Sequence, residues 1–267
     1  MTLSDGELDA ALAHWREHGW ARLGKLADDA TARALRDRVR AIMLGEVTYD
    51  GLFFQHDSES GRYEDLPYGE GWVGPSLQYR KVEKLEKDPL FWAWIRADVF
   101  RQLAARIYAS ASVSLYRAFV MHKHEGGGSP LPWHQDGGEF WGLDRDPVMT
   151  IWTALDDAPL DGGCVEVLPG SHTRGLATRN GGVVPRDKLD PAGADARALP
   201  LPAVAGEVLL LHNHVWHRSG PTRTGRPRTA LSVCYMDGAT RCRRQKRAPR
   251  RFVDVWAAAD ARTANRT

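Results

Sequence analysis

Two histidines and one aspartate have the types and the spacing of a metal-binding site. His134 and Asp136 are separated by one residue, and His217 follows much later in the chain. On an extended strand, residues i and i+2 point to the same side, so His134 and Asp136 can share one metal while Gln135 points away. Two imidazoles and one carboxylate are the ligands of non-haem Fe(II) oxygenases, and they leave positions open for a cosubstrate and oxygen. The pattern predicts an iron site.

Arg228 strengthens this interpretation because it lies a short distance beyond His217. A guanidinium can hold a carboxylate through two parallel hydrogen bonds. The cosubstrate 2-oxoglutarate chelates iron through its 2-oxo acid end and carries a free carboxylate at the other end. We therefore expect Arg228 to hold that carboxylate and to belong, with the three metal ligands, to the catalytic site.

The chain has ten histidines, so the choice of ligands has alternatives. His122 and His124 are also two residues apart, but no carboxylate follows at the right offset. His212 and His214 lie close to His217 and are candidates for groups that orient a ligand. His172 follows a Pro-Gly-Ser turn, where a structural role is expected.

The motifs around these residues resemble a known family. They are His134–Gly138 (HQDGG), Gly162–His172 (GGCVEVLPGSH), His217–Thr222 (HRSGPT) and Arg228. From about Ser114 to Tyr235, with a weaker match back to Gln78, the chain resembles the phytanoyl-CoA dioxygenase family of Fe(II)/2-oxoglutarate oxygenases. The resemblance implies that Fe(II), 2-oxoglutarate and O2 are the cofactors.

The same resemblance implies further residues of the cosubstrate pocket. Ser219 would present a hydroxyl beside Arg228, and Trp152 would flank the 2-oxoglutarate chain. Lys81 and Phe119 would line the pocket from their strands. Each has an alternative role, because Trp152 and Phe119 could be core residues, Ser219 could close a turn, and Lys81 is one of several lysines in a surface-like segment.

Composition and charge exclude several classes of function. The net charge of +2 over 267 residues gives no general attraction to nucleic acid. The basic run at 241–251 has no interleaved aromatic residues, so we interpret it as a solvated segment. Three cysteines are too few for a disulfide framework. Neither a signal segment nor a run of about 18 apolar residues is visible, and we expect a cytoplasmic protein without membrane or nucleic-acid partners. The oligomeric state stays open.

The apolar periodicity predicts helices followed by strands. Helices are expected at 5–17, at 29–44 and, as one long helix, from Asp88 through Ile107. Strands are expected at Val113–Met121, Val148–Leu155, Gly163–Leu168, Glu207–His212 and Thr229–Met236. This order predicts a mainly β protein with peripheral helices, a double-stranded β-helix (jelly-roll, cupin-like) barrel. We expect one domain over 1–267, with N-terminal helices at about 5–110, the metal-binding barrel at about 111–240 and a basic segment at 241–267.

Two long segments without clear periodicity, Gly45–Pro75 and Ala177–Pro202, are expected to close over the metal site and to help choose the substrate, although ordinary surface insertions remain an alternative. Gly137 and Gly138 let the backbone approach a ligand, which would place Glu139 and Trp141 at the mouth of the site. An acidic group and an aromatic face suit sugars or amino sugars.

The sequence thus predicts a dioxygenase that oxidises a C–H bond of a small molecule. The expected substrate is a sugar-containing natural product, such as an oligosaccharide or aminoglycoside antibiotic, and the expected outcome is hydroxylation or oxidative ring (orthoester) closure. Hydroxylation of an acyl-CoA, an amino acid or another secondary metabolite is the first alternative. A barrel that binds a small molecule without turnover is the second, but it would predict a broken ligand set.

Overall fold

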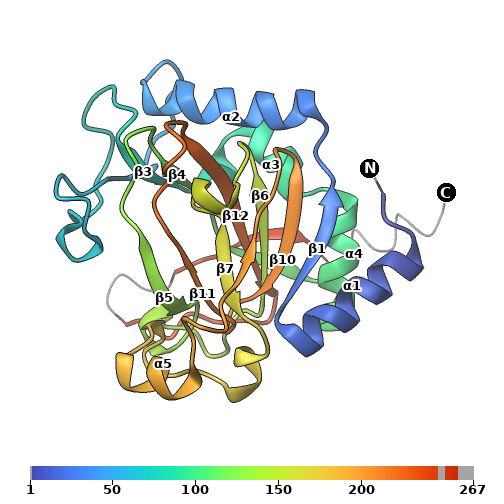
Figure 1. Cartoon of the computed structure of the whole chain (residues 1–267). Coiled ribbons are helices and arrows are strands. Elements are labelled where there is room, and N and C mark those ends of the chain that lie inside the picture. The colour runs from blue at the N-terminus through green and yellow to red at the C-terminus, as the bar shows by residue number, and fades with distance from the viewer. Residues whose placement is uncertain (1, 246–249, 258–267) are drawn as a thin grey trace.

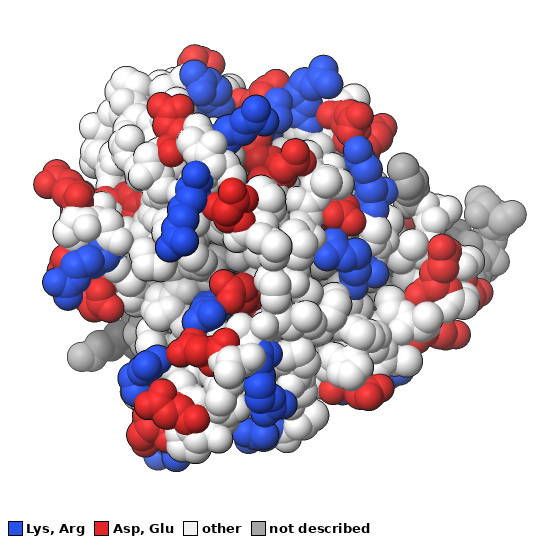
Figure 2. All heavy atoms as spheres, viewed as in Figure 1, with Lys and Arg blue, Asp and Glu red and all other residues white. Residues whose placement is uncertain are grey.

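The computed structural model describes residues 2–245 and 250–257 (Figure 1). Residues 246–249 and 258–267, which belong to the predicted basic segment, therefore lie outside the described residues. Within the described ranges, no helix is long and apolar enough to cross a membrane. On the face shown in Figure 2, basic and acidic side chains are interspersed, and no large area of one sign covers it.

The described strands form two antiparallel sheets. The larger sheet runs, in spatial order, β1 (Trp20–Lys25), β10 (Glu207–His212), β6 (Met149–Ala154), β12 (Arg228–Asp237), β4 (Val113–Lys123), β3 (Tyr79–Glu83) and β2 (Phe53–His56), and β13 (Val253–Trp256) also pairs with β4. The smaller sheet runs β8 (Gly182–Val183), β5 (Leu131–Gln135), β11 (Trp216–Ser219), β7 (Val165–Leu168) and β9 (Leu199–Leu201). The predicted mainly β, jelly-roll class is confirmed, as two sheets rather than one continuous closed barrel.

Helices cover the outer face of the larger sheet. They are α1 (Asp5–His18), α2 (Asp29–Met43), α3 (Pro89–Ile95) and α4 (Asp98–Tyr108), while α5 (Arg186–Ala192) lies beside the smaller sheet (Figure 1). Local chemistry explains where α1 begins and ends. Ser4 and Glu7 form a reciprocal capping box at its start, and Gly19 adopts φ 82° just after its end.

The central strands of the larger sheet are buried on both faces because they separate a hydrophobic core from an inner cavity. On β6, Ile151 packs with the helices, whereas its neighbour Trp152 faces the cavity. On β12, Val233 belongs to the same core and Ser232 lines the cavity. Successive residues of a strand point to opposite faces, so one strand serves packing and chemistry at once.

Two predictions about the N-terminal part were wrong. The long helix from Asp88 is two helices, because Ala97 has an extended backbone (ψ 136°) that interrupts the helical hydrogen bonds between α3 and α4. The region 5–110 is also not helical throughout, since it supplies β1, β2 and β3 to the larger sheet. The segment 177–202 likewise contains β8, α5 and β9.

Candidate metal centre and cosubstrate cavity

A cavity of about 690 Å³ lies between the two sheets and contains most of the predicted site residues. The larger sheet lines it from β3, β4, β6 and β12, and the smaller sheet lines it from β5 and β11. Both long segments reach it, the first through Tyr63, Glu64 and Leu66 and the second through 180–183. Both segments therefore contribute to the cavity wall, and their closure over the metal site and their part in substrate choice stay predictions.

The two predicted histidine ligands face each other across the smaller sheet. His134 on β5 is the direct cross-strand partner of His217 on β11, and the ring centroids are 3.9 Å apart. The Nδ1 atoms lie 2.8 Å from the Pro132 carbonyl and 2.9 Å from the Val215 carbonyl, respectively. A carbonyl can only accept, so Nδ1 carries the proton and Nε2 keeps a lone pair for a metal.

Burial keeps the first imidazole neutral. Removal from water, helped by the neighbouring His217, lowers the pKa of His134 to about 3. A neutral imidazole is the form that binds metals. The pair of rings therefore fits a divalent cation in its tautomers, and His134 also does so in its protonation state.

Asp136 lies beside the histidines, and a guanidinium holds it. Its backbone N–H donates to the Asn213 carbonyl (2.8 Å), and its Oδ1 accepts from Arg117 Nη2 at 2.9 Å. Burial alone would raise the pKa of Asp136, but Arg117 and the two imidazoles outweigh that effect and lower it. The carboxylate is therefore ionised, with Oδ2 left for a metal.

The three candidate ligands do not converge on one point. Among residues 2–245 and 250–257, no three His, Cys, Asp or Glu side chains are grouped closely enough to hold a metal ion. The imidazole rings of His134 and His217 contact each other, whereas the Asp136 carboxylate pairs with Arg117. In residue type, charge and tautomer the set fits Fe(II), and the carboxylate must shift to complete it.

The predicted cosubstrate residues all line the cavity. They are Lys81, Phe119, Trp152, Ser219 and Arg228. Arg228 is 3% exposed, donates Nη2 to the Gly163 carbonyl at 2.7 Å, and leaves its buried Nε without a partner. Burial lowers its pKa to about 10, so the guanidinium is still charged at neutral pH. A buried, partly unpaired guanidinium is what an anionic ligand requires.

The two predicted substrate residues have different positions. Trp141 lines the cavity, stacked on Tyr116 with ring centroids 4.1 Å apart and an interplanar angle of 8°. Glu139 is not among the described residues that line the cavity, and its carboxylate pairs with Arg179. The following residue, Phe140, takes the place at the cavity wall that we expected for Glu139.

One supporting residue, Arg117, was missed by sequence reasoning, and a second, His214, was only one of two candidates. Arg117 lies between the rings of Phe119 (4.6 Å) and Trp141 (4.7 Å) while it binds Asp136. His214, expected only as one of two orienting candidates, pairs with Asp146 at 3.2 Å. The sequence signal for Arg117 was a charged residue within an otherwise apolar strand, Val113–Met121.

The two sheets and the cavity between them define a jelly-roll fold with a candidate metal centre. The fold is that of the epimerase SnoN, solved in complex with Fe3+, alpha ketoglutarate and nogalamycin RO, with a TM-score of 0.71 and 17% identity over 90% of this chain and 88% of that one. Residues 15–230 match the family described as Phytanoyl-CoA dioxygenase (PhyH), and the chain belongs to this family of Fe(II)- and 2-oxoglutarate-dependent dioxygenases.

Two relatives give the extent of the similarity. The mouse "Phytanoyl-CoA dioxygenase domain-containing protein 1" is 29% identical over 159 residues, which cover 57% of this chain and 54% of that protein. The rice "Phytanoyl-CoA dioxygenase 1" is 25% identical over 256 residues, 86% of this chain and 89% of the relative. The match thus spans about half the length of the mouse protein and most of the rice protein.

Proposed function

We propose that this protein oxidises a C–H bond of a small-molecule natural product, using Fe(II), 2-oxoglutarate and O2. The proposal rests on the His134–His217 pair. Both imidazoles are fixed in the metal-binding tautomer, and they line a cavity that the buried Arg228 also lines. When bound, iron and 2-oxoglutarate supply the oxidising power, and the cosubstrate is converted to succinate and carbon dioxide.

His134, His217 and Asp136 would hold the iron. The neutral imidazoles donate through Nε2, and Asp136 supplies the negative charge. Arg117 would keep its hold on Oδ1 and so fix the direction of the carboxylate, the part that a hydrogen-bonded neighbour of a metal ligand plays. This arrangement also explains why the half-buried Arg117 lies between two aromatic rings beside Asp136.

Arg228 on the larger sheet would hold the far carboxylate of 2-oxoglutarate, and Ser219 lines the same cavity from the smaller sheet. Trp152 and Phe119 give apolar sides to the cosubstrate chain. Lys81 pairs with Glu83, and its Nζ lies 4.8 Å from the centre of the Phe119 ring. Lys81 therefore supports the cavity wall and can bind a ligand only if its ion pair with Glu83 breaks.

For the substrate we propose a natural product of the kind modified in antibiotic biosynthesis, with a sugar-containing molecule as the first candidate and hydroxylation or ring closure as the outcome. The nogalamycin ligand of SnoN and the aromatic wall formed by Phe140 and Trp141 support this class. The position of Glu139, paired with Arg179 outside the cavity, removes one of the two residues that favoured a sugar.

The test is succinate formation from 2-oxoglutarate by anaerobically purified protein given Fe(II), ascorbate and air, with sugars, oligosaccharide antibiotics, acyl-CoAs and amino acids as substrates. We expect stimulation by one class and loss of at least about 99% of turnover in Asp136→Ala, because the iron loses its anionic ligand. Asp187→Ala, an exposed aspartate on α5, is the control and should keep the parent rate. An Asp136→Ala protein with the parent rate would refute the assignment.

A further inference from the structure

Arg80 on β3 presents to the cavity a guanidinium that no carboxylate neutralises. It lines the cavity and is 6% exposed. Its Nη1 donates to Gln55 Oε1 at 3.1 Å, while its buried Nη2 has no partner. Within the described part of the chain, Arg80 forms no ion pair within 4.0 Å. A buried charge is costly unless something pairs with it, which points to a ligand.

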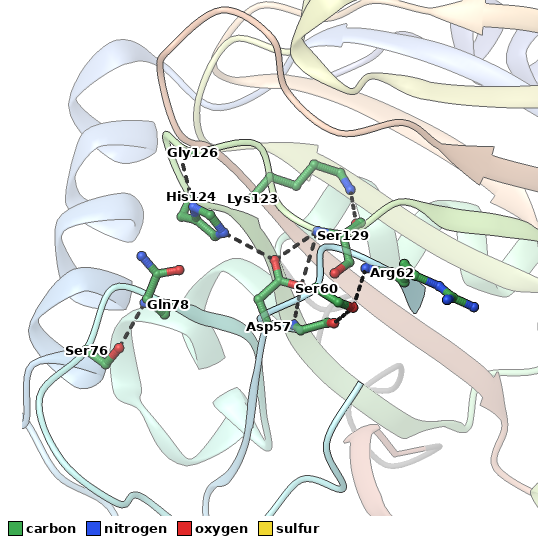
Figure 3. A network of polar contacts seen from close by, with 10 residues as sticks. Asp57, Ser60, Arg62, Ser76, Gln78, Lys123, His124, Gly126 and Ser129 are labelled. Carbon is green, nitrogen blue, oxygen red and sulfur yellow. Dashed lines mark hydrogen bonds and ion pairs between the residues drawn. The ribbon is translucent and has the colours of Figure 1, made fainter. Parts of the chain in front are cut away.

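The nearest carboxylate, Asp57, is already engaged. It accepts from the backbone N–H groups of Ser129 (3.0 Å) and Ser58 (2.9 Å) and lies 3.6 Å from His124 Nε2, as the close-up in Figure 3 shows for Ser129 and His124. These contacts tie the 57–62 loop to the loop 124–130, which connects β4 to β5. Asp57 raises the pKa of Arg80 only from a distance, and burial, the larger effect, lowers it.

The neighbouring cation Lys123 binds the loop 124–130 rather than facing the cavity. Its Nζ donates to the Ser129 carbonyl at 2.9 Å (Figure 3), and it is not among the described residues that line the cavity. The only acidic lining residue near the rim, Glu64, is exposed and lies 3.7 Å from Arg62 Nε. Arg80 is therefore the cation at this end that a ligand can reach.

The other cations of the cavity have partners. Arg117 pairs with Asp136, Lys81 with Glu83, and Arg218 with Glu166. Neither Arg228 nor Arg80 has a carboxylate partner within the described residues, and the proposed function assigns Arg228 to the cosubstrate. Arg80 is then the unpaired cation left for the substrate.

We propose that Arg80 anchors an acidic group of the substrate, a carboxylate or a phosphate, at the end of the cavity bordered by Gln55 and Tyr63. The planar fork of a guanidinium suits a two-oxygen anion, and Nη2 is the free donor. This inference rests on the proposed function, since it concerns the same cavity. It selects acidic substrates over neutral molecules of the same shape.

The experiment measures binding without turnover. The anaerobic protein with Fe(II) and 2-oxoglutarate is titrated calorimetrically with matched probes: glucuronate and glucose, glucose 6-phosphate and glucose, and benzoate and methyl benzoate. We expect at least one acid to bind about tenfold or more tightly than its neutral partner, as a charge-assisted hydrogen bond implies. Arg80→Gln should abolish that preference and Arg80→Lys should retain part of it. The affinity for 2-oxoglutarate should be the same in all three proteins.

The controls separate the alternatives. Arg101→Gln removes an exposed arginine that pairs with Asp98 on α4, and should keep the preference for the acid. If the parent binds iron and 2-oxoglutarate but favours no acid, the inference about Arg80 is wrong while the proposed function stands. If Arg80→Gln instead weakens the binding of 2-oxoglutarate tenfold, Arg80 binds the cosubstrate and the inference is also overturned.

Failure of the parent to bind iron or 2-oxoglutarate would refute the proposed function itself. If Arg80→Gln does not fold, Arg80→Lys is used instead, because it keeps the charge. Its preference for the acid should then be smaller than that of the parent.

Discussion

At the scale of single residues, the site depends on groups that orient the ligands as much as on the ligands themselves. The carbonyls of Pro132 and Val215 fix the tautomers of the two histidines, and Arg117 fixes one oxygen of Asp136. These contacts exist before any metal arrives, so the entropy of the ligand side chains is lost during folding rather than on metal binding. Metal binding then requires the Asp136 carboxylate to turn toward the two imidazoles.

The position of Arg117 gives a prediction for iron affinity. Arg117→Gln should weaken iron binding about ten- to a hundredfold, the usual effect of removing a hydrogen-bonded neighbour of a metal ligand. Competition with a coloured chelator under anaerobic conditions measures the dissociation constant. Arg117→Lys should restore part of the affinity because it keeps a cation beside Asp136.

Arg218→Gln is the matched control, since Arg218 also lies on the cavity wall and over an aromatic ring, Trp133 at 4.6 Å, but pairs with Glu166. It should leave iron affinity within about twofold of the parent. An Arg117→Gln protein that also stays within twofold would show that Asp136 needs no such support.

The sequence predicts the ligands better than their supports, for a physical reason. His134, Asp136, His217 and Arg228 are predicted because binding a metal and a carboxylate would require these residue types at this spacing. Arg117 reaches Asp136 only because β4 of one sheet lies over β5 of the other, a relation between distant segments that spacing along the chain does not contain. A charged residue in an apolar strand, such as Arg117, indicates that it has a polar partner, but the sequence does not show that this partner is Asp136.

At the scale of elements, the sequence predicted those with strong local signals. The capping box of α1 and the apolar repeat of α2 predict the ends of those two helices to within one or two residues. The strand β1 was missed because it is short and contains Gly24, where its register shifts. The break between α3 and α4 was missed because it falls at Ala97, a residue with high helix propensity that tertiary packing overrides.

The segment 178–183 depends on backbone contact with the metal-binding turn, and this gives a second prediction. Gly181 has φ +70°, and a Cβ there would lie 2.1 Å from the Gly137 carbonyl oxygen. Gly181→Ala must therefore push the segment away from the turn that follows Asp136. We expect it to lower the free energy of unfolding by about 1–3 kcal/mol more than backbone strain alone, as overpacking does.

Gly61→Ala supplies the matched measurement of backbone strain. Gly61 has the same φ of +70°, but a Cβ there meets nothing within 4 Å. The substitution should lower the free energy of unfolding by about 1–2 kcal/mol, the usual strain of a left-handed backbone for an L-residue. Urea denaturation of the two variants and the parent gives both numbers. Equal losses at Gly181 and Gly61 would mean that the segment moves without resistance.

At the scale of the whole molecule, one face of the larger sheet packs in the apolar core and the other lines the cavity. The helices and one face make the apolar core, which contains Leu35, Phe100 and Tyr235, whereas the other face carries the polar cavity. Titratable groups are consequently buried near the sheet, beyond those of the site. His122 on β4 is one, 9% exposed and 2.9 Å from Thr229 Oγ1 through Nδ1.

His122 makes the stability of the fold depend on pH. Burial, with the positive charge of Arg228, lowers its pKa to about 4 from an ordinary value of 6.5. Between those values the unfolded chain binds the proton more readily than the folded one, so stability is fully present above pH 6.5 and is lost as the pH falls through 4. The difference corresponds to roughly 3 kcal/mol for this one group.

His122→Gln removes this proton-binding group, so its unfolding free energy should fall less than that of the parent between pH 7 and pH 4.5. His122→Asn, a second substitution that removes the titrating group, should reproduce the flatter profile of His122→Gln. Half-buried carboxylates such as Asp146, whose pKa is lowered, also reduce stability in acid, but they do so equally in all three proteins and cancel in the comparison. Denaturant unfolding at the two pH values measures the effect. Parallel profiles for His122→Gln and the parent would show that His122 takes up its proton as easily in the folded chain as in the unfolded one.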